Sequence, residues 1–249
     1  MKLSKVVIVL LTISGIILLS TGIYLSINSP SIQSISTEEE KEEQKKEEVQ
    51  EVKEVYVNPL PEYRTLHNNN DIMAKLEIPS LSIDALITIS TDNAYYLSYN
   101  IDHYEDGLGV PFFDYRNTNL KEDKQINIYG HNTLNEKYYD ALPFKKLESY
   151  KEEEFFTNNK DIYLYTDQEK VKYHVVAVKF VTDEDNEHMR ITFKSNEEYL
   201  NHLNKLLNNT LYKDEIDVKS INQLLVLQAC NFTPVRNYLL VIAKRIEDQ

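Results

Sequence analysis

The chain has 249 residues, 42% of them hydrophobic, and a formal net charge of −13. No run of Lys and Arg interleaves with aromatic residues, so nucleic acid is a poor candidate partner. A single cysteine, Cys230, excludes an internal disulfide.

The N-terminal segment predicts a membrane anchor. Residues 6–27 carry no charge and match the length of a helix that crosses a bilayer of about 30 Å. Lys2 and Lys5 precede this segment and no Lys or Arg follows before Lys41, so the N-terminus should lie inside and the rest outside the cell. A cleaved signal peptide is the alternative, but no small-x-small site follows. We therefore assign 1–27 to the cytoplasmic start and transmembrane helix.

An acidic spacer is expected next, over residues 28–57. Residues 38–54 contain nine Glu and four Lys and no aromatic residue. Such a composition buries too little apolar area to offset the loss of chain entropy on folding. The spacer should therefore be disordered and carry no chemistry.

The remaining residues, 58–249, have the size of one domain, and short strand-like segments dominate them. Apolar runs and period-2 alternation predict eight strands. These are 73–78, 83–89, 110–114, 125–129, 161–166, 171–180, 223–228 and 238–246. Many short strands with few helices favour a barrel or a sandwich.

Three helices are predicted among these strands. Ser195 to Glu198 reads as a capping box, and leucines at helical spacing follow it. Two shorter helices are expected over 138–147 and 62–69. The fold class is therefore mostly β, with a few peripheral helices.

Cys230 ends the apolar run that begins at Leu224, and His131 follows Gly130 at the end of another run. A thiol with a pKa near 8.5 is only about 3% thiolate at neutral pH, and a nearby imidazole supplies the missing activation. Gly130 should let the backbone turn sharply and leave the imidazole at a strand end. The alternative for Cys230 is a small buried apolar residue. None of the other five histidines follows a glycine at the end of an apolar run; these are His67, His103, His174, His188 and His202.

Together these features resemble the sortases. Phe112 to Asn117, followed by Ile128 to Asn132, is similar to the class B members in particular. The resemblance implies a closed eight-stranded sortase-type β-barrel and a cysteine transpeptidase. It would cleave a C-terminal sorting motif of secreted proteins through a thioester on Cys230 and transfer them to a cell-wall peptide amine.

The resemblance also implies roles for individual residues. His131 would act as the proton donor, and an arginine near the start of the last strand would support the oxyanion. The family position of that arginine falls on Tyr238 here, so Arg236, two residues earlier, is assigned the role, with Tyr238 as the competitor. Tyr238, Asn132 and Tyr129 are the expected substrate-binding residues.

Two other functions remain open. The Gln228-Ala229-Cys230 run echoes a caspase motif, but Asn231 breaks it and the spacing from His131 is too long, which leaves another kind of cysteine endopeptidase as a general alternative. A non-catalytic cell-surface binding module could also use the same barrel. No metal-ligand spacing is present, and we expect neither a metal nor another cofactor.

Overall fold

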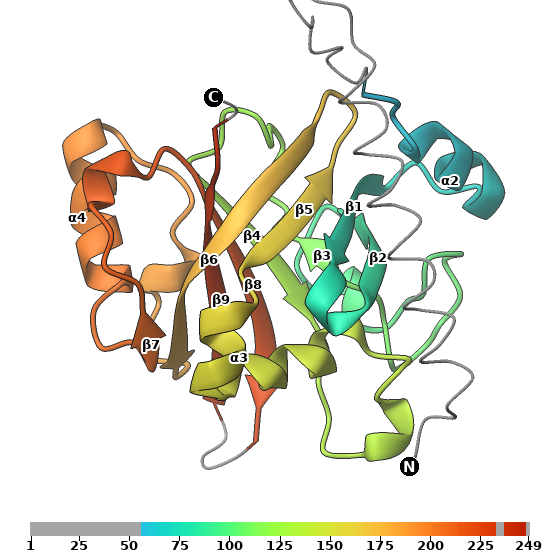
Figure 1. Cartoon of the computed structure of the whole chain (residues 1–249). Coiled ribbons are helices and arrows are strands. Elements are labelled where there is room, and N and C mark those ends of the chain that lie inside the picture. The colour runs from blue at the N-terminus through green and yellow to red at the C-terminus, as the bar shows by residue number, and fades with distance from the viewer. Residues whose placement is uncertain (1–55, 233–236, 248–249) are drawn as a thin grey trace, which may run out of the picture. The chain divides into compact units, whose positions relative to one another are not determined.

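The structure, a computed structural model, describes residues 56–232 and 237–247 (Figure 1). They belong to the second of two compact units, which begins at Lys53. Its strands are β1 (Ile72–Ile78), β2 (Ile83–Thr88), β3 (Phe112–Phe113), β4 (Gln125–Gly130), β5 (Asp161–Tyr165), β6 (Lys170–Val181), β7 (Tyr212–Lys213), β8 (Leu224–Asn231) and β9 (Asn237–Arg245). Its α-helices are α2 (Leu60–His67), α3 (Glu153–Asn158) and α4 (Asn196–Leu206). Short 3₁₀ helices include η1 (Pro79–Leu81), η2 (Tyr95–Leu97), η3 (Glu136–Tyr138), η4 (Pro143–Lys151), η5 (Glu187–Met189) and η6 (Val218–Ser220).

Eight strands close into a barrel. Their order is β5-β1-β2-β3-β4-β8-β9-β6, and a further pairing of β5 with β6 completes the ring. β7 pairs with β6 outside the ring. The parallel β4–β8 pair stands out because most other neighbours in the ring are antiparallel.

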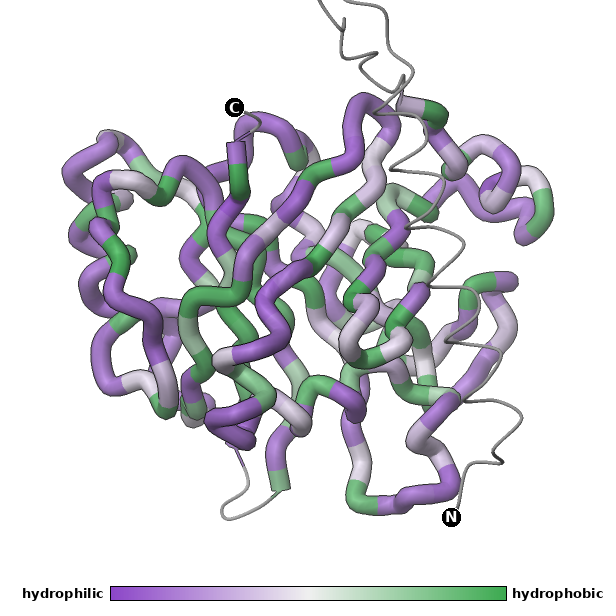
Figure 2. Tube along the Cα trace, in the orientation of Figure 1, coloured by the Kyte–Doolittle hydropathy of each residue, from purple (hydrophilic) through white to green (hydrophobic). Residues whose placement is uncertain are grey.

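The strands β8 and β9 read as continuous apolar runs because both of their faces are buried. Leu225, Leu227 and Ala229 belong to the core that includes the inward residues of β1, β4 and β5. Leu224 and Val226 belong to a second cluster with apolar residues of α4. Figure 2 shows the hydrophobic stretches along the central strands and hydrophilic loops around them. Helix α4 thus covers one outer side of the barrel.

The outer face of β4 is polar instead of apolar. Gln125 and Asn127 are buried, and both donate to the backbone carbonyl of His188 in η5, at 2.7 and 2.9 Å. His202 of α4 lies within 2.7 Å of the Gln125 amide oxygen. These bonds fix the 187–190 segment and α4 against the barrel wall, and the cleft described below lies beside them.

The strand predictions are confirmed at all eight positions, although the predicted strand at 110–114 shortens to the two residues of β3. The Ser195 cap is confirmed, since its hydroxyl accepts from the Glu198 amide at 3.1 Å, but the Glu198 carboxylate accepts from the Lys194 amide and not from the Ser195 amide of a complete capping box. The helix predicted over 138–147 is confirmed only in part: the chain forms the 3₁₀ helices η3 and η4 there, with residues 139–142 between them. The buried residues Phe144, Leu147 and Tyr150 of η4 recur every three residues, which suits a 3₁₀ helix.

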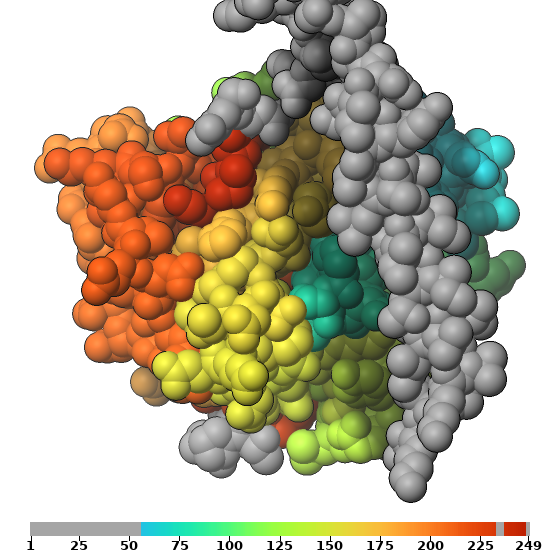
Figure 3. All heavy atoms as spheres, in the orientation of Figure 1, coloured from blue at the N-terminus to red at the C-terminus, as the bar shows by residue number. Residues whose placement is uncertain are grey.

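Helix α3 and strand β7 were not predicted. In Figure 3 the yellow surface around α3 lies at the centre of the displayed face, between the orange surface of the C-terminal half and the teal surface of β1 and η1. Among the residues that the structure describes, no helix is long and apolar enough to span a bilayer. The predicted anchor (residues 6–27) and nearly all of the spacer lie outside the described residues.

Candidate active site

A cleft of about 300 Å³ lies on the outer face of the barrel, where β4 and β8 end and β9 begins. The cleft is lined by Asn93, Leu97, Phe112, Tyr129, Gly130, His131, Met189, Gln228, Ala229, Cys230 and Tyr238. Its lining is mostly apolar, with few polar groups, as is typical of ligand sites. Cys230, His131, Tyr129 and Tyr238, four of the predicted site residues, therefore meet in one place.

The register of two parallel strands brings the cysteine and the histidine together. Gly130 of β4 pairs with Ala229 of β8, and the next residue on each strand is His131 and Cys230. Because side chains alternate between the two faces of a strand, Cys230 shares the outward face with Gln228, and Ala229 points into the core. Cys230 is half-buried and open to the cleft.

A backbone carbonyl fixes the protonation pattern of His131. Its Nε2 atom lies 2.8 Å from the carbonyl oxygen of Leu97, and a carbonyl only accepts. Nε2 therefore carries a proton, and Nδ1 is the ring atom that can take up or release one. Leu97 belongs to η2, whose neighbouring Tyr96 is buried and donates to Asp71 at 2.7 Å. The contact thus holds the imidazole at the cleft from a well-anchored segment.

Gly130 leaves room for a neighbouring side chain and does not form the predicted turn. It is the last residue of β4, and a Cβ atom added there would lie 2.6 Å from ring atoms of Phe144. Phe144 is fully buried in η4. A side chain at position 130 would therefore displace η4 or the strand that carries His131.

Asn132 connects the histidine loop to the cysteine strand. Its Nδ2 atom donates to the carbonyl oxygen of Cys230 at 2.7 Å and to Glu148 of η4 at 2.9 Å. Its Oδ1 atom accepts from the Thr133 amide at 2.7 Å. Asn132 is only 6% exposed and does not line the cleft. The geometry gives it a positioning role, and its predicted contact with substrate stays a prediction.

Tyr129 lines the cleft with its ring. Its hydroxyl donates to the buried carboxylate of Asp114 at 2.8 Å. Burial and the nearby Asp114 charge raise the pKa of Tyr129, so the phenol stays protonated at neutral pH. Its ring packs against Phe112 with centroids 5.6 Å apart, which leaves the ring as the surface that a substrate would meet.

Strand β9 brings Tyr238 directly opposite Cys230. The two residues are partners in the antiparallel β8–β9 ladder, and Tyr238 lines the cleft. Arg236 lies outside the described residues. The choice between Arg236 and Tyr238 for the oxyanion contact therefore stays a prediction.

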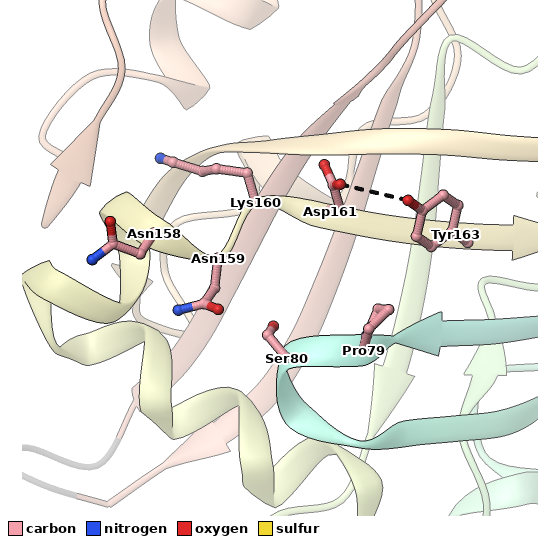
Figure 4. Close-up of a pocket in the computed structure, with 7 residues that line it drawn as sticks. All are labelled: Pro79, Ser80, Asn158, Asn159, Lys160, Asp161 and Tyr163. Carbon is pink, nitrogen blue, oxygen red and sulfur yellow. Dashed lines mark hydrogen bonds between the residues drawn. The ribbon is translucent and has the colours of Figure 1, made fainter. Parts of the chain in front are cut away.

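A second hollow, of about 380 Å³, lies beside α3 and is larger than the cleft. Figure 4 shows its lining of Pro79, Ser80, Asn158, Asn159, Lys160, Asp161 and Tyr163, with Tyr163 directed at Asp161. Lys160 is paired with Asp214 at 2.8 Å and Lys172 with Asp161 at 2.8 Å. This lining contains neither a cysteine nor a histidine, so the smaller cleft is the better candidate for catalysis.

Sequence reasoning did not find four other residues of the cleft: Asn93, Leu97, Met189 and Gln228. Asn93 comes from a loop, and Leu97 and Met189 come from the three-residue 3₁₀ helices η2 and η5, which are too short for a periodic pattern to mark a residue. The Phe112–Asn117 motif was the available signal, because Asp114 within it bonds to Asn93 and Tyr129.

Comparisons with known proteins show the family of the chain. A family model for the sortase domain matches residues 76–246. Sortase B of Listeria monocytogenes is 28% identical over 163 residues, which span 66% of this chain and 64% of that protein. Sortase B of Staphylococcus aureus is 21% identical over 190 residues, 75% of each chain.

Solved structures of sortase B share the fold of this chain. The crystal structure of Clostridium perfringens sortase B superimposes with a TM-score of 0.66 at 28% identity, covering 74% of this chain and all of that one. A Staphylococcus aureus sortase B–substrate complex, 21% identical, shares the fold with a TM-score of 0.65, covering 76% of this chain and 86% of that one.

Proposed function

Because the chain belongs to the sortase family and resembles its class B members, we propose that it is a membrane-anchored cysteine transpeptidase. It would cleave secreted proteins within a C-terminal sorting motif and join them to an amine of cell-wall peptide. The observation that carries the proposal is the register of β4 and β8, which places His131 and Cys230 side by side in one cleft.

The reaction would proceed in two transfers. The Cys230 thiolate attacks the carbonyl carbon of the motif's Thr, and Arg236 or Tyr238 supports the oxyanion that forms. The Nδ1–H of protonated His131 then donates its proton to the departing amine, and a thioester remains on Cys230. The incoming amine attacks that thioester, gives a proton to Nδ1 and releases the Cys230 thiolate.

Two features support His131 in this role. The bond from Nε2 to the Leu97 carbonyl leaves Nδ1 as the exchanging atom. The register of β4 and β8 also places the imidazole beside the Cys230 thiol in the same cleft, where a proton can pass to the departing amine.

The first experiment is mass spectrometry of residues 56–249 incubated with a panel of sorting-motif peptides, the Asn-Pro-x-Thr-Asn type included. Cleavage between Thr and the next residue, with a Cys230-linked acyl adduct, is the expected result. Selective labelling of native Cys230 by a thiol reagent is a second readout. An unreactive Cys230 with no cleavage of any peptide would favour the non-catalytic binding module.

The anchor is a separate part of the proposal. Its support is the uncharged run 6–27 behind Lys2 and Lys5. The full chain should sediment with membranes and be released only by detergent, and a chain lacking residues 1–55 should not sediment. Recovery of the full chain without detergent would remove the anchor from the proposal and leave the chemistry intact.

A further inference from the structure

The cleft has two walls that come from distant parts of the chain. One wall is the 93–97 segment, with Asn93 and Leu97, and the other is η5, with Met189. Neither wall is part of a regular strand. Gln125 and Asn127 of β4 hold the η5 wall at the His188 carbonyl, and a different contact must connect that wall to the 93–97 segment. One buried carboxylate, Asp114, lies between the two walls.

Asp114 follows β3 directly and its side chain is fully buried. Toward the first wall, it accepts from the Asn93 amide at 3.2 Å, and the amide of the next residue, Tyr115, donates to Asn93 Oδ1 at 2.9 Å. Toward the floor it accepts from the Tyr129 hydroxyl at 2.8 Å. Both the nitrogen and the oxygen of the Asn93 side-chain amide are therefore hydrogen-bonded to the 114–115 segment.

Arg116 makes the connection to the opposite wall. Its Nε and one terminal nitrogen both donate to Asp114 at 2.7 Å, in the paired geometry that gives the strongest carboxylate contacts. The same terminal nitrogen donates to the carbonyl oxygen of Met189 at 2.9 Å. Burial alone would raise the pKa of Asp114, but the hydrogen bonds from Arg116 and Tyr129 lower it, so the carboxylate is charged at neutral pH.

We propose that Asp114 and Arg116 form a clamp that sets the width of the substrate cleft by joining Asn93 on one wall to Met189 on the other. They are positioning residues, because both act through the wall residues that line the cleft. This inference rests on the proposed function of the cleft. It gives the Asp114-Tyr115-Arg116 motif a specific task in substrate binding.

The clamp lies away from the reacting atoms. The Asp114 amide donates to the carbonyl of Asn127, whose partner on β8 is Val226, four residues before Cys230. At about 3.3 Å per residue this separation is about 13 Å along the strand. Loosening the clamp should therefore weaken binding of the peptide more than it slows the chemical step. Leu97 keeps its place through the buried Tyr96, so its bond to His131 should survive.

The test compares Asp114→Asn, Arg116→Gln and the double variant, using the sorting peptide that wild-type protein cleaves best. We expect KM to rise about fivefold or more, with kcat within about twofold of wild type. Because both residues act through one clamp, the double variant should be no worse than Asp114→Asn alone. Alkylation of Cys230 by iodoacetamide should keep its wild-type rate.

The chain contains a matched control. Arg64 donates to both oxygens of Asp167 at 2.9 Å and to the carbonyl of Ile72 at 2.8 Å, a similar arginine–carboxylate–carbonyl arrangement whose residues do not line the cleft. Arg64→Gln and Asp167→Asn should leave KM and kcat unchanged. An unchanged KM in the clamp variants, or a loss confined to kcat, would overturn the proposal.

Backbone hydrogen exchange makes the test independent of turnover. In both clamp variants the amides of residues 93–95 and 187–190 should exchange faster, and those of β8 and β9 should not. Unaltered exchange at either wall would refute the clamp even if wild-type protein cleaved no peptide, an outcome that would count separately against the proposed function. Arg116→Gln is the safer variant for folding, since the Arg116 side chain is 38% exposed.

Discussion

Gly130 and Ala229 face each other in the parallel β4–β8 ladder, and this pairing places His131 and Cys230 at the same level at the end of the two strands. The two residues are 99 positions apart in the sequence, and every residue pair of this ladder has the same separation. The position of this proposed catalytic pair thus follows from the register of the two strands. Any change that shifts β4 against β8 should separate the imidazole from the thiol.

Cys230→Ala should abolish peptide cleavage and acyl adduct formation and leave the fold intact. The side chains differ only by the sulfur, and Cys230 is half-buried at a strand end, where the loss of a small group is tolerated. Peptide cleavage, intact-protein mass and the thermal midpoint are the measurements. Turnover by the alanine variant would eliminate the cysteine mechanism.

Gly130→Ala should destabilise the protein by about 1–3 kcal/mol, because the new methyl group would meet the Phe144 ring at 2.6 Å. In a Phe144→Ala background the same change should cost less, since the ring is gone. Gly107→Ala is the control, because nothing lies within 4 Å of a Cβ atom there. Denaturant unfolding measures all four variants, and equal costs in both backgrounds would contradict the steric explanation.

The sequence predicts the strands β4 and β8, but it does not show why position 130 must be a glycine. The apolar runs ending at Cys230 and preceding His131 predict the two strands, because short runs of apolar residues are visible in the sequence. The sequence does not show that Gly130 faces Phe144, since that contact joins a strand to a 3₁₀ helix. A glycine before a histidine therefore suggested a turn, although the backbone at Gly130 is part of a strand.

The walls of the cleft were harder to predict for a related reason. Asn93 lies in a loop and Met189 in the short 3₁₀ helix η5, and the positions of both segments depend on side-chain bonds to Asp114 and Arg116. Such bonds depend on the tertiary structure and leave no periodic pattern. The strand pattern therefore predicted a barrel or a sandwich with Cys230 and His131 at strand ends. The Phe112–Asn117 motif was the only feature of the sequence that pointed to the walls.

Asn132→Ala should lower kcat/KM about 10- to 100-fold, because it removes the donor to the Cys230 carbonyl and leaves Glu148 without its amide partner. If Asn132 positions Cys230, alkylation of the thiol by a small reagent should slow as well. Glu148→Gln should have a milder effect, since the amide oxygen can still accept. Asn204→Ala on α4 is the matched control. A rise in KM with normal alkylation would instead support the predicted substrate contact.

The pH dependence of stability should depend in part on Asp114. Its pKa is lowered in the folded state, so its contribution is complete above the unfolded value of about 3.9 and is lost as pH falls through the folded pKa. The difference in unfolding free energy between wild type and Asp114→Asn should therefore be constant from pH 5 to 7 and shrink below about pH 4. Urea titrations across this range measure it, and a constant difference down to pH 2 would contradict the lowered pKa.

Arg236 and Tyr238 are the two candidates for the contact that stabilises the oxyanion of the tetrahedral intermediate. Tyr238 lies opposite Cys230 and lines the cleft, and its hydroxyl could supply one hydrogen bond but no charge. Arg236, two residues before it in the sequence, would add a positive charge and a planar fork of donors. If Arg236 has this role, Arg236→Ala should lower kcat by about 10²–10³, or about 3–4 kcal/mol of transition-state stabilisation, and Arg236→Lys should recover little.

Tyr238→Phe is the comparison variant, measured at saturating peptide. It removes one hydroxyl and keeps the ring that lines the cleft, so we expect a small loss. A large loss for the tyrosine variant alone would transfer the role to Tyr238. Losses in both variants would mean that the two side chains share the oxyanion. The two substitutions therefore decide whether charge or a neutral hydrogen bond stabilises the tetrahedral intermediate in this cleft.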